Sequence, residues 1–278
     1  MKIIAHISDL HFGTEDVSVA AALRDDLHSA KPDLVVVSGD LTQRARSRQY
    51  QAAQTYLSEI PGPQLIVPGN HDVPLYDVLR RFFSPLGRYH RYISAEVNPV
   101  YRDEEMLVVG INTARSFTWI NGRISPEQIE AMRTTLQREA SALFKIVVTH
   151  HPFIPPPGEA GAGIALVGRA ARALTVIDEG GVDLLLAGHL HKGYTGDVRT
   201  YYPATKRSVI VAQASTAISK RLRGQPNAYN LITLAGDHIS IAVRAWNGTG
   251  FAPAALISYR RRESEWRLEI AASGEAEN

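Results

Sequence analysis

The sequence predicts an α/β fold built from two mixed β-sheets flanked by helices. Up to Gly193, short apolar runs alternate with longer segments of helical period, and beyond Gly193 the pattern becomes rich in strand signals. The 278 residues, 45% of them hydrophobic, are enough to bury a substantial core. Since no long linker interrupts the pattern, we expect one domain over residues 1–272 and a frayed tail over residues 273–278.

Buried strands are predicted where a short apolar run is bounded by polar residues. Six such runs precede Gly193, and they span residues 3–7, 34–38, 65–67, 106–111, 146–149 and 184–187. Further runs at residues 209–212, 229–234 and 239–246 are separated by turn signals such as Gly236-Asp237. These later runs predict a second sheet that is antiparallel in part.

Helices are predicted over residues 19–30, 46–60 and 125–143, where apolar residues recur with helical spacing. The third has the clearest start, because Ser125 can cap it, Pro126 suits its first turn and Gln128 completes a capping box.

Residues 152–163 carry four prolines and three glycines, which excludes a helix or a central strand and predicts a loop. Whether this loop is a substrate lid or contacts a membrane surface or a partner is open.

Composition and charge narrow the function classes. The chain has no cysteine, so any bound metal must take nitrogen and oxygen ligands. The formal net charge is only +2, which gives no strong attraction for nucleic acid. No stretch approaches the roughly 20 apolar residues of a membrane span, and the opening apolar run is too short for a signal peptide. We therefore expect a soluble, cytoplasmic protein.

Side chains that can bind metals fall where the predicted strands end: Asp9, His11, Asp40, Asn70, His71, His150, His189 and His191. Because the carboxyl ends of strands in an open α/β sheet form one edge, residues far apart in sequence converge there. Two metal ions about 3.5–4 Å apart need a shared carboxylate and a mixed set of oxygen and nitrogen ligands, which this set supplies. The sequence therefore predicts a dinuclear metal site at the C-terminal edge of the strands.

The same residues resemble the motifs of a known family. Five motifs occur in the order found in the calcineurin-like metallophosphoesterases: Asp9-Leu10-His11, Gly39-Asp40, Gly69-Asn70-His71-Asp72, His150 and Gly188-His189-Leu190-His191. The resemblance spans residues 3 to about 192. It implies a four-layer αββα sandwich, in agreement with the two sheets and flanking helices predicted above.

The resemblance also implies a role for each motif residue. One metal would be held by Asp9, His11, Asp40 and His191, and the other by Asp40, Asn70, His150 and His189. Asp40 would then bridge the ions, and a bridging water or hydroxide would be the in-line nucleophile on phosphorus. His71 is expected beside the leaving oxygen as proton donor or charge stabiliser, with Asp72 orienting its ring. The metals are open among manganese, iron, zinc and cobalt.

The adjacent histidines His150 and His151 cannot both face the metals along an extended chain. The family's motif resembles His, any residue, Pro, and Pro152 therefore selects His150 as the ligand.

Other residues near the predicted edge have an ordinary structural role as the alternative. Asp72 alone is also typical of a turn before a proline. Asn112 and Thr113 either contact a phosphate oxygen or form a plain turn, and Arg115 either clamps a phosphate or lies in solvent.

The motif set resembles the branch that contains bacterial class III cyclic-nucleotide phosphodiesterases and glycerophosphodiesterases. This implies a phosphodiesterase that acts on a small-molecule phosphate ester. One rival is a pyrophosphatase or esterase acting on a nucleotide-linked lipid precursor, suggested by the apolar run Phe153-Ile154-Pro155-Pro156-Pro157. Another is a non-catalytic scaffold of the same fold. The oligomeric state is open, a homodimer included.

Overall fold

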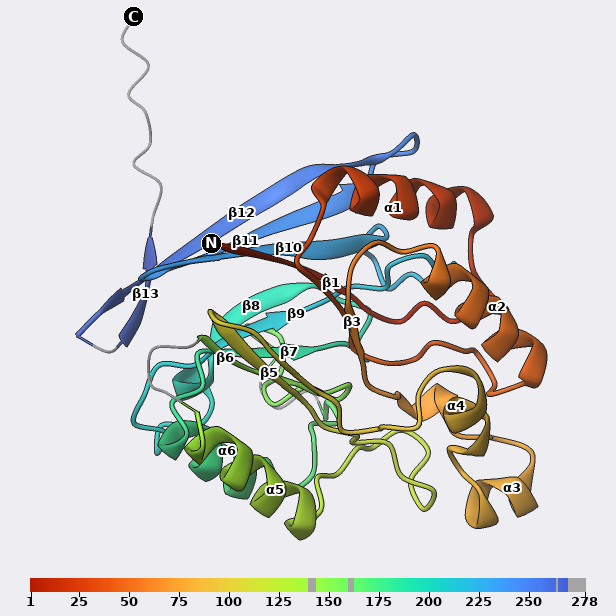
Figure 1. Cartoon of the computed structure of the whole chain (residues 1–278), viewed down its shortest axis with the longest axis horizontal. Coiled ribbons are helices and arrows are strands. Elements are labelled where there is room, and N and C mark those ends of the chain that lie inside the picture. The colour runs from red at the N-terminus through yellow and green to blue at the C-terminus, as the bar shows by residue number, and fades with distance from the viewer. Residues whose placement is uncertain (140–143, 160–162, 264, 270–278) are drawn as a thin grey trace, which may run out of the picture.

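The computed structural model describes residues 1–139, 144–159, 163–263 and 265–269. Within these ranges two β-sheets face each other and helices cover their outer faces (Figure 1). This confirms the predicted sandwich of two mixed sheets flanked by helices. The tail predicted over residues 273–278 lies outside the described residues.

The first sheet has seven strands in the order β13-β12-β11-β10-β1-β2-β3. They are β1 (Lys2–Ile7), β2 (Leu34–Val37), β3 (Gln64–Ile66), β10 (Ala228–Ala235), β11 (His238–Trp246), β12 (Phe251–Arg262) and β13 (Glu265–Glu269). The β1 strand is parallel to β2 and antiparallel to β10, so it joins the N-terminal and C-terminal parts of the chain.

The second sheet has six strands in the order β4-β5-β6-β7-β9-β8. They are β4 (Val100–Arg102), β5 (Met106–Gly110), β6 (Phe144–Val148), β7 (Leu184–Ala187), β8 (Tyr194–Asp197) and β9 (Ile210–Gln213). β5, β6, β7 and β9 are parallel to one another, whereas β4 and β8 at the edges pair antiparallel with β5 and β9.

The prediction that a separate second sheet follows Gly193 was wrong. Strands β10 to β13 extend the first sheet, and the second sheet is built around β5, β6 and β7, which the apolar pattern did not separate from β1 and β2. Local pattern identifies a strand but not its neighbour, because the pairing partner is chosen by long-range packing.

Side chains along each strand point alternately to its two faces. The apolar residues are therefore divided between a core that lies between the two sheets and a core under the outer helices. In β1, Ile4 points between the two sheets, whereas Ala5 and Ile7 pack under the outer helices. The neighbouring β2 shows the same alternation, with Leu34 in the inter-sheet core and Val35 in the outer one. Each central strand is therefore buried on both faces, which explains its unbroken apolar sequence.

Helices α1 (Val17–Ala30) and α2 (Ser47–Ser58) cover the first sheet, and α5 (Pro126–Gln137) and α6 (Ala170–Glu179) cover the second (Figure 1). The predicted capping box forms at the start of α5, where the Ser125 hydroxyl accepts a hydrogen bond from the Gln128 N–H at 3.2 Å. This helix ends at Gln137, before the predicted end at residue 143, and residues 140–143 lie outside the described ranges.

Three short elements between β3 and β4 were not predicted from the sequence. They are a single 3-10 turn, η1 (Asn70–Asp72), and the helices α3 (Val78–Phe83) and α4 (Gly87–Tyr92). Helix α6 and the 3-10 turn η2 (Val198–Thr200) were also missed. In the part of the chain that is described, no helix is long and apolar enough to cross a membrane.

The proline-rich loop is irregular over residues 152–159, as predicted. Its apolar side chains Phe153 and Ile154 are each only 2% exposed and pack in the core beneath the second sheet. The Tyr194 hydroxyl donates a hydrogen bond to the Ile154 carbonyl at 2.6 Å, which anchors the loop to β8. The apolar run is therefore core, and it does not support the lipid-precursor function that it suggested.

Candidate metal centre

The predicted ligands converge where the strand ends of the two sheets meet. Asp9 and Asp40 follow β1 and β2 of the first sheet, whereas His150 and His189 follow β6 and β7 of the second. Backbone hydrogen bonds join the turns within each sheet, from the Asp9 N–H to the Gly39 carbonyl and from the Gly188 N–H to the His150 carbonyl. The site thus lies between two sheet edges and not on the single edge that the sequence predicted.

One group of ligand candidates, Asp9, His11, Asp40 and His191, is almost completely buried. The Nε2 atoms of His11 and His191 lie 3.0 Å apart, and the Asp9 Oδ1 lies 3.2 Å from the His191 Nε2. The other Asp9 oxygen accepts hydrogen bonds from the Ser8 hydroxyl and the His189 N–H. Asp9 is therefore held in place on one side and presents its Oδ1 to the histidines.

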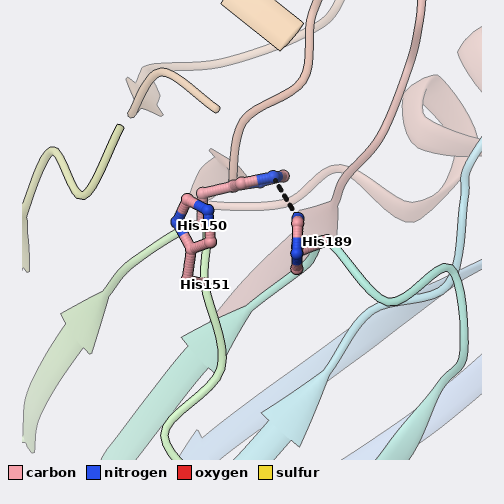
Figure 2. Close-up of side chains that lie close together, drawn as sticks. All are labelled: His150, His151 and His189. Atoms are coloured by element: carbon pink, nitrogen blue, oxygen red, sulfur yellow. Dashed lines mark hydrogen bonds between the residues drawn. The ribbon is translucent and has the colours of Figure 1, made fainter. Parts of the chain in front are cut away.

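A second group contains Asn70, His150 and His189. The His150 Nε2 lies 3.1 Å from the Asn70 Oδ1 and 3.3 Å from the His189 Nδ1, as the dashed line in Figure 2 shows for the two histidines. The His150 side chain is buried, whereas Asn70 and His189 are only partly buried and line a cavity.

Asp40 lies between the two groups, with one carboxylate oxygen toward each. Its Oδ2 is 3.6 Å from the His11 Nε2, and its Oδ1 is 3.4 Å from the His150 Nε2. The Oδ1 also accepts a hydrogen bond from the His71 N–H at 2.9 Å. This is the arrangement that a carboxylate shared between two cations requires.

Backbone carbonyls orient two of the imidazole rings. The His191 Nδ1 donates a hydrogen bond to the Arg221 carbonyl, and the His150 Nδ1 donates one to the Ser38 carbonyl, each at 2.7 Å. A ring whose Nδ1 carries the proton presents the lone pair of its Nε2, which is the usual orientation of a metal-binding histidine.

The His151 ring, although adjacent, has both nitrogens engaged by the protein. Its Nε2 donates to the Ile120 carbonyl at 2.8 Å, and its Nδ1 lies 2.7 Å from the Thr113 hydroxyl. Burial, with His189 and His150 nearby, holds its pKa well below the usual value, so the ring is neutral. No lone pair remains for a metal, and Thr113 orients this ring and has no contact with the cavity.

Burial and charge together set the ionisation of the site. Burial alone would raise the pKa values of Asp9 and Asp40, but the neighbouring histidines hold both well below the usual range. Burial tends to lower the pKa of His150, yet the Asp40 carboxylate raises it to about 9. Burial lowers the pKa of His11 to about 4. Two ionised carboxylates are thus buried among imidazoles, an environment that favours a bound cation.

The backbone is left-handed at five of these residues: Asp9, His11, Asp40, His189 and His191, with φ between 48° and 76°. Non-glycine residues seldom adopt this conformation, and each instance costs of the order of 1–3 kcal/mol. The surrounding hydrogen bonds hold these turns, so that Asp9 and His11 both face the site and the intervening Leu10 packs in the core.

Close packing requires glycine before two of the ligands. A Cβ atom at Gly69 would overlap the Asp40 carboxylate, and one at Gly188 would overlap the Ser8 hydroxyl and lie 2.6 Å from the Asp9 Oδ2. Steric space is therefore the reason for glycine at these two positions.

The residues present fit a metal centre. Among the described residues, the buried Asp9 Oδ1 has no hydrogen-bond partner, and it faces the two imidazole nitrogens that lie 3.0 Å apart. Two carboxylates, an amide oxygen and four imidazoles form a nitrogen and oxygen donor set that suits borderline divalent ions.

Asp72 does not orient the His71 ring, and that prediction was wrong. The His71 Nδ1 donates instead to the Gln43 carbonyl at 2.9 Å, while its Nε2 faces the cavity. The Asp72 carboxylate accepts hydrogen bonds from the N–H groups of Leu41, Thr42 and Gly69. It joins the turn after β2 to the turn after β3, so its contribution is to hold Asp40 and Asn70 in register.

A family model described as calcineurin-like phosphoesterase matches residues 3–193. The chain belongs to the calcineurin-like phosphoesterase family. Together with the buried metal-binding groups, this makes it a metal-dependent hydrolase of phosphoric esters, as the motifs predicted.

Relatives of this phosphoesterase include two named probable cyclic nucleotide phosphodiesterases. The one from Synechococcus sp. is 25% identical over 203 residues, which cover 69% of this chain and 74% of the relative. The one from Pseudoalteromonas sp. is 24% identical over 254 residues, which cover 87% and 91%. A solved purple acid phosphatase from yellow lupin seeds shares the fold, with a TM-score of 0.66 and 14% identity over 92% of this chain and 53% of that one.

A third relative has a higher identity over a shorter segment. The glycerophosphodiester phosphodiesterase GpdQ of Enterobacter lignolyticus is 37% identical over 81 residues, which cover 25% of this chain and 29% of GpdQ.

The cavity beside the ligands contains an arginine that the sequence analysis missed. The Arg221 Nη1 lies 3.3 Å from the Nε2 atoms of both His11 and His71, and no carboxylate of the described residues pairs with this guanidinium. Only folding brings it here, because it lies 30 residues beyond the last ligand in sequence. Arg115, which the sequence analysis considered as a phosphate clamp, instead donates hydrogen bonds to the Gln128 side chain and the Ala114 carbonyl.

The cavity has a volume of about 670 Å³, within the range of sites for small molecules. Its polar wall includes His71 and Arg221, and its apolar wall includes Leu75, Trp119 and Ile120. The phosphoesterase site therefore borders a cavity with room for a small-molecule ester.

Proposed function

We propose that this phosphoesterase hydrolyses phosphate diesters at a dinuclear metal centre. The observation that carries this proposal is the position of Asp40, whose two carboxylate oxygens face separate groups of metal-binding side chains. A mononuclear site would not need a carboxylate shared in this way.

Each metal would have four protein ligands. Asp9, His11, Asp40 and His191 would hold the first ion, and Asp40, Asn70, His150 and His189 the second. When bound, the two ions would supply neutralisation of phosphate charge and acidification of the attacking water. The donor types suit manganese, iron or zinc.

His71 is suited to act on the leaving group. Its Nδ1–H is held by the Gln43 carbonyl, which directs the Nε2 into the cavity. A protonated Nε2 can donate its proton to an alkoxide as the ester bond breaks. The backbone N–H of His71 also fixes the Asp40 Oδ1, so this residue connects the ligand set to the substrate side.

Arg221 is suited to bind the phosphoryl group. Its guanidinium lies next to His71 and His11, where it can donate hydrogen bonds to non-bridging oxygens and stabilise charge that develops in the transition state. The two named classes of relative, cyclic-nucleotide and glycerophosphodiester hydrolases, both act on diesters, and the cavity can hold either substrate.

The two rival functions lack a specific observation in their favour. A lipid precursor was suggested by Phe153 and Ile154, which are buried. A non-catalytic scaffold would not need five strained ligand residues and two buried carboxylates, since strain and burial both lower stability. The cytoplasmic location and a homodimer stay predictions.

The test is a substrate panel on protein purified without added metal, with metal content measured on the same sample. We expect two metal ions per chain and faster hydrolysis of cyclic nucleotides, glycerophosphocholine and bis-p-nitrophenyl phosphate than of p-nitrophenyl phosphate or pyrophosphate. The Asp40→Asn variant, purified in the same way, controls for contaminating hydrolases. A single ion at full activity, or a clear preference for monoesters, would contradict the proposal.

A further inference from the structure

Two segments beside the cavity expose an unusual amount of apolar surface. Eight of the large apolar side chains that are exposed in the described structure belong to residues 76–83 and 117–120: Tyr76, Val78, Leu79, Phe82, Phe83, Phe117, Trp119 and Ile120. Phe83 and Phe117 are each 85% exposed, and Leu79 is 74% exposed. We call these eight side chains the entrance surface. Contiguous apolar surface of this kind marks a binding face.

The two segments are fastened together, so the entrance surface is one structure. Arg81 is only 3% exposed and donates hydrogen bonds to the carbonyls of Pro74, Ser116 and Thr118 at 2.6–2.8 Å. The same guanidinium lies over the Trp119 ring, and the Phe82 and Phe117 rings are 5.4 Å apart. Arg81 thus holds both segments from the inside, while the eight side chains, Trp119 included, stay 48–85% exposed.

The entrance surface adjoins the catalytic cavity. Trp119 and Ile120 line the cavity, and the Asn70 side chain donates a hydrogen bond to the Trp119 carbonyl at 3.3 Å. Helix α3, which carries Leu79 and Phe83, lies at the periphery of the molecule (Figure 1). A binding partner that covered the entrance surface would therefore lie beside the opening of the cavity.

The two segments of the entrance surface carry a net positive charge. Residues 73–95 and 113–124 contain six arginines and one carboxylate, Asp77. Arg81 is internal, and Arg80 and Arg88 lie 3.0 and 3.8 Å from the Asp77 carboxylate, whereas Arg91 and Arg123 are exposed. The whole chain has a net charge of only +2, so these segments are more positive than the rest of the chain. A partner that matches it must be both apolar and anionic.

We propose that the entrance surface docks on an anionic lipid bilayer. Exposed Phe, Leu and Trp side chains flanked by arginines are the combination that lies in the bilayer interface and is attracted to acidic headgroups. A second copy of this chain fits less well, because a two-fold contact through the same face would bring two arginine-rich surfaces together. This inference goes beyond the proposed diesterase activity and does not require it.

The docking geometry would bring the cavity opening to the membrane surface. The apolar wall formed by Leu75, Trp119 and Ile120 would continue the path from the membrane to the metal centre.

The test is sedimentation of the full chain with vesicles of phosphatidylcholine alone and of phosphatidylcholine with phosphatidylglycerol. We expect binding to the anionic vesicles, weakening as salt is added, and little binding to phosphatidylcholine alone. The Leu79→Ser/Phe83→Ser variant should bind at least about tenfold more weakly, since two apolar side chains no longer enter the bilayer. Circular dichroism checks that this variant is folded.

A matched control is available on the opposite part of the molecule. Leu256 and Leu268, on β12 and β13, are 70% and 59% exposed, and the Leu256→Ser/Leu268→Ser variant should bind vesicles as the wild type does. Absence of binding to anionic vesicles at low salt would overturn the proposal, as would equal loss of binding in both double variants. A wild-type dimer that Leu79→Ser/Phe83→Ser converts to a monomer would assign the surface to a second copy instead. No substrate is used, so the result is independent of the diesterase activity.

Discussion

The two halves of the metal centre differ in how far they are removed from solvent. In the first half, Asp9, His11 and His191 are each at most 3% exposed, and all three have a left-handed backbone. In the second half, His150 is buried but Asn70 and His189 border the cavity, and only His189 has a positive φ. The first half therefore borders the cavity only through His191 and the shared Asp40, which are almost completely buried, whereas Asn70 and His189 of the second half are partly exposed to it. We expect the first ion to be held tightly and the second to exchange.

The largest expected effect comes from Asp40, which belongs to both halves. Asp40→Asn removes a buried charge from between the His11 and His150 rings, so it should reduce turnover of bis-p-nitrophenyl phosphate to background and lower the content of both metals. Metal analysis after gel filtration measures this. If a folded Asp40→Asn protein keeps both ions, Asp40 does not bridge the halves.

Removing one ligand from each half in turn tests whether the two halves hold their metal ions with different affinity. His150→Ala should leave the tightly held first ion in place and empty the second site, with a loss of activity of orders of magnitude. His11→Ala should remove the first ion, and the exchangeable second site should then keep little metal through purification. Metal content by mass spectrometry distinguishes the two variants. Equal metal loss in the two variants would show that the two halves do not hold their ions differently.

His151→Ala is the matched control, because its ring is adjacent to His150 but faces Thr113 and Ile120. Both ions should remain bound, and the lost hydrogen bonds should lower the free energy of unfolding by about 1–3 kcal/mol.

The substrate side can be tested apart from the metals by replacing His71. His71→Ala should keep both ions and lose about 10²–10⁴-fold in rate with glycerophosphocholine, whose alkoxide leaving group needs a proton. The loss should be smaller with bis-p-nitrophenyl phosphate, because p-nitrophenolate is stable as an anion. Rates on the two substrates and metal content are measured on one preparation. Equal losses on both substrates would exclude a dominant acid role.

Arg221 provides a second substrate-side test, with an expected effect of about 10²-fold in kcat for Arg221→Ala. Metals should stay, because it is the Arg221 carbonyl, not its side chain, that orients His191. Inorganic phosphate should also inhibit this variant more weakly, whichever ester is the substrate. The neighbouring, exposed Lys220 is the control for loss of one positive charge, and Lys220→Ala should behave as the wild type. Unchanged kcat and phosphate inhibition in Arg221→Ala would rule out a phosphoryl contact.

The smallest expected effect is a pH dependence of stability in the metal-free protein. Asp40 raises the pKa of His150 from 6.5 to about 9, so the protonated His150 stabilises the fold fully below pH 6.5 and loses this effect as pH rises toward 9. The melting temperature of EDTA-treated protein should therefore fall across this interval. His150→Gln should remove that part of the slope. An identical slope in the variant would show that other groups cause it.

The sequence predicted the central strands and singled out the candidate ligands because both are local properties. An apolar run that stops at Asp9 or Asp40 identifies the strand and its functional end together. The choice of His150 over His151 also followed from a local pattern, the proline two residues after the ligand, and the ring contacts agree with it.

Predictions that depended on long-range contacts were less accurate. The pairing of β10 with β1 was missed because nothing in either strand specifies the other as its neighbour. Asp72 was assigned to His71 because the two are adjacent, whereas its carboxylate reaches back to the turn at residues 41–42. The apolar run at residues 153–157 was interpreted as a surface because proline excluded regular structure, although a loop can also contribute to the core.

By itself, the sequence determined the order of strands and helices along the chain, the ligand types and the class of reaction, since each depends on residue identity and short spacing. Only the tertiary structure decided which strands share a sheet, that the site lies between two sheet edges, and that Arg221 and the entrance surface lie beside it. The physical reason is that these features arise from contacts between segments more than 200 residues apart, such as Arg221 with His11. The free energy of such contacts depends on burial and geometry that no local pattern contains.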